Sequence, residues 1–354
     1  EPNTRTTVTE LYDGLECISQ NHWGSLKYDL LALNDLFSPF LTAGFYYKTF
    51  MWPKAFWEKV YEPIIRASAG LGRLSGEPDP DGYDKGVLHC DILVIGSGPA
   101  GLLAALAAGR AGARVILADE DFRMGGRLNT ETYEVSGKNG FDFASETLEE
   151  LASIDNVQLM PRTTVYGAYD HGIYGALERI TDHLPSSVGR PRQILWRIYS
   201  KRAILCAGAT ERPIAFGNND RPGVMLAGAV RAYVNRWGVV PGKQVAIFTN
   251  NHDGWRTAID LAKNGVEITG VIDSRDVTPP VKLQGVAAFM GERVVDTAGR
   301  HGIRSITLQG GQHISADCLA VSGGWNPNLH LTCHLNGRPV WSEDIAAFVP
   351  GSGI

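Results

Sequence analysis

Cysteine is scarce in this chain of 354 residues: there are five, and no two have a Cys-x-x-Cys spacing. They are Cys17, Cys90, Cys206, Cys318 and Cys333. The missing Cys-x-x-Cys argues against a dithiol reductase, and the scatter argues against a disulfide or zinc framework. We expect ordinary buried thiols in a reducing compartment, and therefore a cytoplasmic protein.

A strong excess of charge and a long apolar run are also missing. The formal net charge is −5 at pH 7, which gives no reason to expect nucleic acid or an anionic membrane as a partner. No apolar run approaches the ~18 residues of a membrane-spanning helix. The first residues, from Glu1, carry no visible signal peptide, and both ends suggest a fragment of a longer polypeptide.

A constellation of catalytic side chains is not visible either. No Ser, His and Asp follow one another in a suitable order, and the histidines are dispersed without metal-ligand spacing. We therefore predict neither a catalytic residue nor a metal site in this chain.

The strongest positive signal is a glycine-rich turn between a strand, 91–95, and a helix, 99–112. Gly96 permits the sharp turn, Gly98 leaves room for a pyrophosphate, and Gly101 lets the helix lie close to the strand. The amides at the start of the helix face the phosphates. The predicted contacts are Gly96, Ser97, Gly98, Pro99, Ala100 and Gly101. The alternative is a tight strand–helix turn with an empty site.

An acidic residue, Asp119, follows the next strand, 114–118. A carboxylate at this position accepts hydrogen bonds from the adenosine ribose and repels a 2′-phosphate. Glu120 is adjacent and is an alternative for the same role. No arginine lies at 119–122 to favour NADP.

Three further segments match positions that contact a dinucleotide in flavoprotein-like folds. A Gly-Gly pair that ends at Gly126 would bring a second loop to the pyrophosphate, with charge from Arg127; the alternative is a plain turn with a solvated arginine. Backbone groups of Thr164 and Val165 would contact the adenine. The turn at Ala207 and Gly208 would close over the dinucleotide. The predicted residues are Gly126, Arg127, Thr164, Val165, Ala207 and Gly208.

A second strand–helix–strand unit begins at Gly242-Lys243, but its turn, 249–254, keeps only Gly254 of the three glycines. Side chains at 249 and 251 would occupy the space that phosphates need. We expect a unit that keeps the fold without the ligand, with Asp253 as the helix cap and His252 as a solvated loop residue. One dinucleotide is therefore expected.

The chain divides into four predicted segments. Residues 1–86 form an extended, aromatic-rich interface segment, and 87–240 form the first Rossmann-type unit. Residues 241–315 form the second, degenerate unit, and 316–354 return to the first unit and are truncated. Further elements are expected as follows: a helix from Trp52 to Arg66 interrupted at Pro63, a helix at 140–153, a strand at 157–165, a helix at 176–184 and a strand at 193–199.

The aromatic run from Gly44 to Lys54, followed by Trp57 to Pro63, closely resembles the alpha subunits of heterotetrameric sarcosine oxidases. Residues 1–5 and 91–120 share this resemblance. It implies an α/β fold of the flavoprotein-like, two-dinucleotide-binding (Rossmann-type) class with an aromatic-rich N-terminal extension. It also implies a longer subunit, with a β-grasp domain before this chain and an aminomethyltransferase-like domain after it.

The resemblance further implies a function for the whole assembly. Such enzymes oxidise sarcosine to glycine and release hydrogen peroxide, with formaldehyde or methylene-tetrahydrofolate as the other product. FAD on the beta subunit oxidises the amine, FMN lies at the alpha–beta interface, and the gamma and delta subunits complete the complex. The alpha subunit is implied to hold NAD on the first glycine turn and on Asp119, Glu120, Gly126, Arg127, Thr164 and Val165.

Two other interpretations remain open. The first is an FAD-dependent oxidoreductase subunit of the opine or hydroxyproline oxidase type, in which the first unit holds FAD. The second is a non-catalytic interaction module with an empty nucleotide site.

Overall fold

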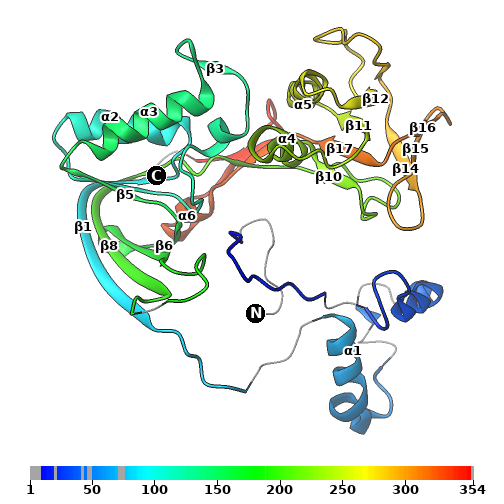
Figure 1. Ribbon diagram of the computed structural model, residues 1–354, viewed down its shortest axis with the longest axis horizontal. Helices are drawn as coiled ribbons and strands as arrows, with labels where there is room; N and C mark the ends of the chain where they lie inside the picture. Colours follow the sequence, from blue (N-terminus) through cyan, green and yellow to red (C-terminus); the bar gives the residue numbers. More distant parts are fainter. Residues whose placement is uncertain are drawn as a thin grey trace. The chain divides into compact units, whose positions relative to one another are not determined.

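A computed structural model describes residues 9–19, 22–40, 44–45, 50–70, 76–187 and 189–351 (Figure 1). The chain forms two compact units. The smaller unit contains Glu1–Asp84 and Arg179–Gln193, and the larger unit contains Lys85–Glu178 and Ile194–Ile354. Each unit is described by itself below.

The smaller unit contains short helical segments: η2 (Leu30–Phe40), η4 (Lys54–Phe56), the π-helix η5 (Trp57–Tyr61) and α1 (Glu62–Ser68). The predicted interruption of a helix at Pro63 is wrong; Pro63 lies in the first turn of α1, where a missing N–H costs nothing. The Tyr61 ring contacts Phe50, and its hydroxyl donates to the Trp52 carbonyl at 2.9 Å. Residues 46–49 of the aromatic run lie outside the described residues.

The first sheet of the larger unit has the strand order β5-β2-β1-β8-β7-β6. Its strands are β1 (Tyr83–Ile95), β2 (Val115–Ala118), β5 (Val157–Met160), β6 (Thr163–Tyr169), β7 (Ile173–Arg179) and β8 (Gln193–Leu205). Helices α2 (Pro99–Arg110) and α3 (Gly140–Ala152) lie together over one face (Figure 1). Strands β1, β2 and β5 are parallel, so the turn after β1 lies at the carboxyl edge of the sheet.

Two expected elements of this sheet are corrected. The helix expected at 176–184 is wrong, because β7 pairs antiparallel with β6. Gly172, with φ of 71°, turns the chain back after β6. The strand expected at 157–165 is two strands, β5 and β6, because Pro161 has no amide for pairing and Arg162 has φ of 54°.

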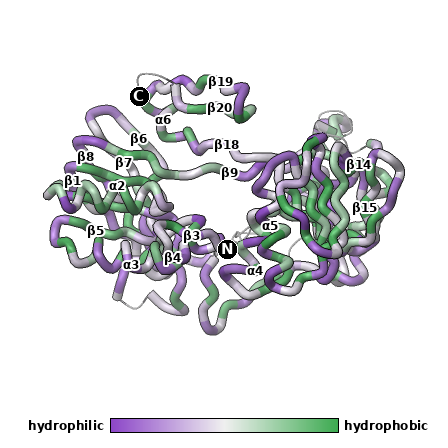
Figure 2. Tube along the Cα trace, turned by 90° about the horizontal axis from the view of Figure 1, so that it is seen from above, coloured by the Kyte–Doolittle hydropathy of each residue, from purple (hydrophilic) through white to green (hydrophobic). Residues whose placement is uncertain are grey.

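The second sheet is parallel, with the order β10-β17-β11-β12-β13. Its strands are β10 (Val224–Leu226), β11 (Gln244–Thr249), β12 (Glu267–Asp273), β13 (Ala288–Met290) and β17 (Cys318–Ser322). Helices α4 (Ala227–Trp237) and α5 (His252–Lys263) pack on one face, and the antiparallel strands β14 (Val294–Ala298), β15 (Ser305–Leu308) and β16 (His313–Ser315) pack on the other. Along β11, Ile247 faces the helices and Phe248 faces the antiparallel strands. Both faces are therefore apolar, and Figure 2 accordingly colours many residues of this part of the chain as hydrophobic.

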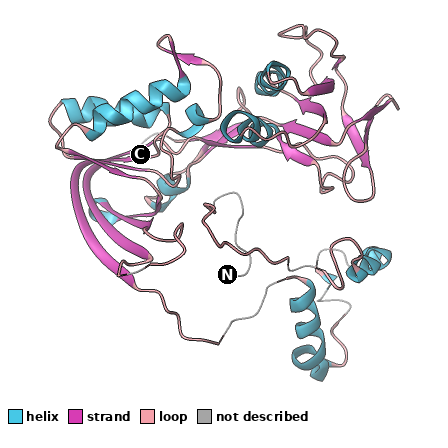
Figure 3. Ribbon diagram, in the orientation of Figure 1, coloured by secondary structure: helices cyan, strands magenta, loops and turns pink. Residues whose placement is uncertain are grey.

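The larger unit also contains short elements outside these sheets, which Figure 3 colours as helices and strands. They are η6 (Gly126–Asn129), β3 (Glu134–Val135), β4 (Lys138–Asn139), η7 (Asp170–Gly172), β9 (Ala209–Glu211), β18 (Trp325–Pro327), α6 (His330–His334), β19 (Val340–Ser342) and β20 (Ala347–Val349). Strand β9 follows β8, and β18 follows β17; they pair with each other. The ends of the two sheets thus come together at this ribbon. Within the described ranges, every helix is too short or too polar to cross a bilayer.

The packing of the fold requires glycine at position 101, but it does not require glycine at position 98. A Cβ on Gly101 would lie 1.8 Å from the Gly96 carbonyl oxygen, whereas a Cβ on Gly98 would meet no atom within 4 Å. We predict that Gly101→Ala lowers the free energy of unfolding by about 3 kcal/mol or more. The matched Gly98→Ala variant should change it by about 1 kcal/mol or less. Urea unfolding measures both values; equal values for the two variants would contradict the described packing.

Candidate functional site

The turn after β1 is shaped by contacts that only glycine allows. Gly96 has φ of 98°, and a Cβ there would lie 2.4 Å from the carbonyl oxygen of Cys206. The start of α2 is thus held tightly against β1 and the end of β8. Outside Gly98, in contrast, the space is open at the N-terminus of α2. An open hollow beside unpaired helix amides is the geometry that holds a phosphate.

A second glycine loop closes one side of this hollow. Gly126 has φ of 54°, and a Cβ on it would lie 2.9 Å from the Gly98 Cα. The buried Ser97 fixes the two loops, because its hydroxyl accepts from the Gly125 amide at 2.9 Å and donates to Asp119 Oδ2 at 2.6 Å. The structure therefore brings together three segments that the sequence separates.

The carboxylate of Asp119 supports the turn as well as facing the site. Its Oδ2 accepts from both the amide and the hydroxyl of Ser97, and its Oδ1 accepts from the Asp121 amide at 2.8 Å. A carboxylate has about four acceptor positions, so about one remains for a ribose hydroxyl. Glu120 follows with an exposed side chain.

The other predicted residues lie at the same edge of the first sheet. The Thr163 amide donates to the Asp119 carbonyl at 2.7 Å, which places Thr164 and Val165 beside the end of β2. The Cys206 amide donates to the Ile95 carbonyl at 2.7 Å, so Ala207 and Gly208 follow next to Gly96. Pro99 and Ala100 form the first turn of α2. Burial raises the pKa of the Cys206 thiol, which keeps it protonated and unreactive.

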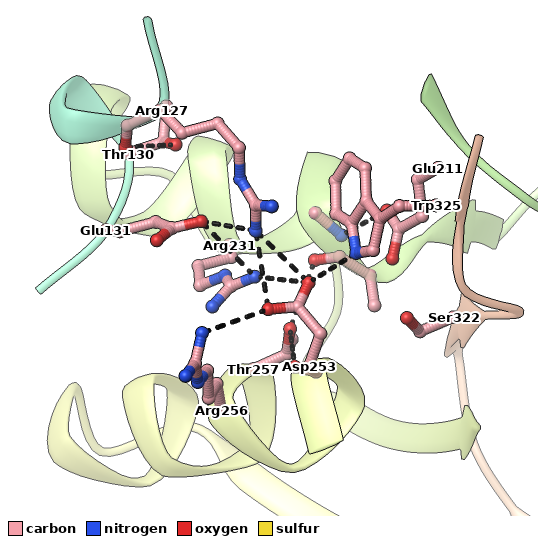
Figure 4. A network of polar contacts seen from close by, with 12 residues as sticks. Arg127, Thr130, Glu131, Glu211, Arg231, Asp253, Arg256, Thr257, Ser322 and Trp325 are labelled. Carbon is pink, nitrogen blue, oxygen red and sulfur yellow. Dashed lines mark hydrogen bonds and ion pairs between the residues drawn. The ribbon is translucent and has the colours of Figure 1, made fainter. Parts of the chain in front are cut away.

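Arg127 points to a protein carboxylate, although the sequence predicts a contact with the pyrophosphate. Its guanidinium pairs with Glu131 and lies 3.2 Å from Asp253 Oδ2 (Figure 4). It also stacks over the Trp325 ring at 4.0 Å from the centroid. The positive charge of Arg127 is thus largely balanced by the chain itself.

The second turn is filled by side chains of the chain. Asn251, not Asp253 as expected, caps α5, because its side-chain oxygen accepts from the Asp253 amide at 2.8 Å. Thr249 presses on Gly254, where a Cβ would lie 2.5 Å from the Thr249 Cβ. His252 is exposed in the first turn of α5.

Asp253 occupies the position at the start of α5 where a dinucleotide domain holds its phosphates. Its carboxylate accepts from Arg231 at 2.8 Å and from the Trp325 indole at 3.2 Å (Figure 4). Burial opposes its ionisation, but the nearby Arg231 outweighs this and lowers the pKa of Asp253 below its usual value. The helix terminus therefore has an internal anion.

A chamber of about 200 Å³ lies between α4, the ribbon β9–β18 and the loop after Gly126. Burial raises the pKa of both Glu131 and Glu211 in its wall. The chamber is lined by Arg127, Thr130, Glu131, Glu211, Leu226, Gly228, Ala229, Arg231 and Trp325. Of these lining residues, only Arg127 is predicted from the sequence as a binding residue. The sequence signal for this chamber is Arg231, the one charged residue of an otherwise uncharged helix segment, 227–234.

A dinucleotide fits the first turn and not the second. The first offers an open hollow at Gly98 and a remaining acceptor on Asp119, whereas the second is blocked by Thr249 and Asp253. Within the described residues, no group of three or more His, Cys, Asp or Glu could hold a metal ion.

The chain is similar to one protein family and to several curated proteins. The model of the FAD-dependent oxidoreductase family matches residues 91–171. The sarcosine oxidase alpha chain of Rhizobium meliloti (strain 1021) is 53% identical over 99% of this chain and 36% of its own length. That of Corynebacterium sp. (strain P-1) is 41% identical over 80% of this chain and 31% of its own length. The chain thus spans about a third of these relatives.

More distant relatives and solved structures share the same fold. An opine oxidase subunit from Agrobacterium tumefaciens (strain Ach5) is 28% identical over 73% of this chain and 57% of its own length. L-proline dehydrogenase from P. horikoshii matches 78% of this chain and 50% of its own, with TM-score 0.61 and 20% identity. Thioredoxin reductase of Lactococcus lactis matches 74% and 85%, with TM-score 0.56 and 15% identity. These matches confirm the Rossmann-type flavoprotein fold.

The contact between Asp253 and Arg231 tests the filled second turn. Arg231 is 2% exposed, so Asp253→Ala removes the nearest partner of a buried cation, with Glu131 left at 3.8 Å, and should lower the free energy of unfolding by about 3 kcal/mol. Arg256→Ala is the matched control, because Arg256 is 61% exposed and lies 3.9 Å from Asp253; it should cost about 1 kcal/mol or less. Urea unfolding at pH 7 measures both.

The same pair predicts a pH dependence. Because the pKa of Asp253 is lowered in the folded state, its contribution is present above the usual value of 3.8 and is lost as the pH falls below it. The stability difference between the protein and Asp253→Asn should therefore shrink between pH 5 and about pH 3. A difference that stays constant over this range would contradict the ion pair.

Proposed function

The chain is a relative of the alpha subunits of sarcosine oxidases over nearly its whole length, and from this we propose that it is the dinucleotide-binding part of such a subunit. We propose that the first turn holds one molecule of NAD. The observation that supports this most directly is the open hollow at Gly98, enclosed by the second glycine loop at Gly126.

A single dinucleotide is supported by the contrast between the two turns. A pyridine-nucleotide-dependent flavin reductase must bind two dinucleotides, one in each Rossmann-type unit. In this chain the second helix terminus already carries Asp253, paired with Arg231. A phosphate placed there would meet a carboxylate in place of a hollow.

The size of the chamber supports NAD over FAD. The path past Gly126 leads to a chamber of about 200 Å³ with four charged side chains in its wall. A single nicotinamide ring suits this space better than the larger, three fused rings of a flavin. FAD remains the second candidate, because the FAD-dependent oxidoreductase family matches residues 91–171.

We propose that the chain's residues bind and orient the nucleotide and that amine oxidation occurs on a partner. In the proposed assembly, FAD on a beta subunit oxidises sarcosine to glycine with release of hydrogen peroxide, and FMN lies at the alpha–beta interface. The one-carbon unit leaves as formaldehyde or as methylene-tetrahydrofolate, gamma and delta subunits complete the heterotetramer, and the location is the cytoplasm. When bound, NAD can accept or donate a hydride; in this chain we assign it a structural role.

The identity of the nucleotide can be read after denaturation of the purified protein. We predict that mass spectrometry of the released small molecules finds NAD and that the fraction from this polypeptide is colourless. A flavin in that fraction would establish the FAD alternative. The absence of any nucleotide, together with no thermal shift on addition of NAD, would contradict both; a ligand at 100 times its Kd should stabilise the fold by ~2.7 kcal/mol.

A variant of the first turn tests where the phosphates lie. Gly98→Val should abolish NAD binding, because its side chain enters the hollow, while the protein stays folded, since a Cβ there meets no other atom within 4 Å. Asn250→Val is the matched control in the second turn, at an exposed position, and should leave binding unchanged. Calorimetric titration measures both; retained binding in Gly98→Val would refute the assignment.

A further inference from the structure

A buried carboxylate oxygen of Glu211 in the chamber has neither a hydrogen bond nor an ion pair among the described residues. Glu211, on β9, is 6% exposed, and its Oε2 accepts from the Gly228 amide at 2.7 Å. The Ser322 side chain also hydrogen-bonds to this carboxyl group, but Oε1 itself is buried without a hydrogen-bond partner among the described residues. A buried acceptor without a donor is costly, so its retention points to a ligand that supplies the donor.

The wall around Glu211 is built to hold this carboxylate in place. A Cβ on Gly228 would lie 2.7 Å from Glu211 Oε2 and 3.3 Å from the edge of the Trp325 ring. A side chain at this position would displace the Glu211 carboxylate from its present place. Other charges in the wall are matched: Arg127 pairs with Glu131, and Arg231 pairs with Asp253 (Figure 4).

The chamber continues the path of the proposed dinucleotide. Arg127 in its wall directly follows Gly126, which lies against Gly98. Asp119 marks the adenosine side of the first turn. A dinucleotide with its pyrophosphate at Gly98 and its adenosine at Asp119 would therefore direct its other end past Gly126 into the chamber.

We propose that the chamber holds the nicotinamide ring, with Glu211 Oε1 accepting a hydrogen bond from the carboxamide NH₂ group. This inference rests on the proposed binding of NAD. It makes Glu211 a specificity-determining residue, because a ligand with a carboxylate in place of the carboxamide has no donor for Oε1 and brings a second negative charge to it.

Three ligands separate this inference from the proposed function. NAD carries the carboxamide, nicotinic acid adenine dinucleotide carries a carboxylate, and ADP-ribose lacks the ring. We predict that the intact protein, with any subunits that purify with it and freed of bound nucleotide, binds NAD about tenfold more tightly than either of the others. A factor of about ten is the size expected for one charge-assisted hydrogen bond. Isothermal titration calorimetry gives the three dissociation constants.

A conservative variant tests the role of Glu211. Glu211→Gln can donate to a carboxylate, so it should narrow or reverse the preference for NAD over nicotinic acid adenine dinucleotide while ADP-ribose binds as before. Glu134→Gln is the matched control, because Glu134 lies exposed on β3, and should retain the preference. The comparison of the three ligands on the unaltered protein needs no variant to fold.

Two different failures are distinguishable. The first is equal binding of the three ligands, or a Glu211→Gln variant that weakens the binding of ADP-ribose as much as that of NAD. In either case the chamber does not recognise the nicotinamide ring, and the inference is wrong while the proposed function stands. If none of the three binds, the proposed function itself fails.

Discussion

The close approach of three backbone segments around Gly98 is the constraint on which the rest of the site depends. A side chain at Gly96 or Gly101 would strike a carbonyl oxygen, and one at Gly126 would strike the Gly98 Cα. These contacts hold β1, α2 and the second glycine loop together and leave open space outside Gly98. Ser97 and Asp119 lock the arrangement with hydrogen bonds of 2.6–2.9 Å.

The strand–turn–helix arrangement occurs in both Rossmann-type units, but only the first leaves open space at the start of its helix. In the first unit the helix terminus faces open space, whereas in the second it faces Asp253, which is held by Arg231 and Trp325. An internal carboxylate satisfies a helix terminus much as a phosphate would. The ion pairs of Asp253 also reach Arg127 in the first unit, so the filled second turn helps to shape the chamber beside the first.

Local patterns in the sequence predict the fold well where a glycine turn fixes the geometry. The strand–turn–helix at 91–112 and the degenerate turn at 249–254 follow from side-chain size alone. The helix expected at 176–184 failed because pairing with β6, which depends on the reversal at Gly172, outweighs local propensity. The chamber could not be predicted, because Glu131, Glu211, Arg231 and Trp325 meet only after both sheets have folded.

The most direct measurement is a crystallographic map of the protein with its nucleotide bound. We predict density for one dinucleotide, with its pyrophosphate at the amides that follow Gly98 and its adenosine ribose at Asp119. Density for the phosphates at the start of α5, or a hollow at Gly98 that is filled by the chain's own atoms, would contradict it.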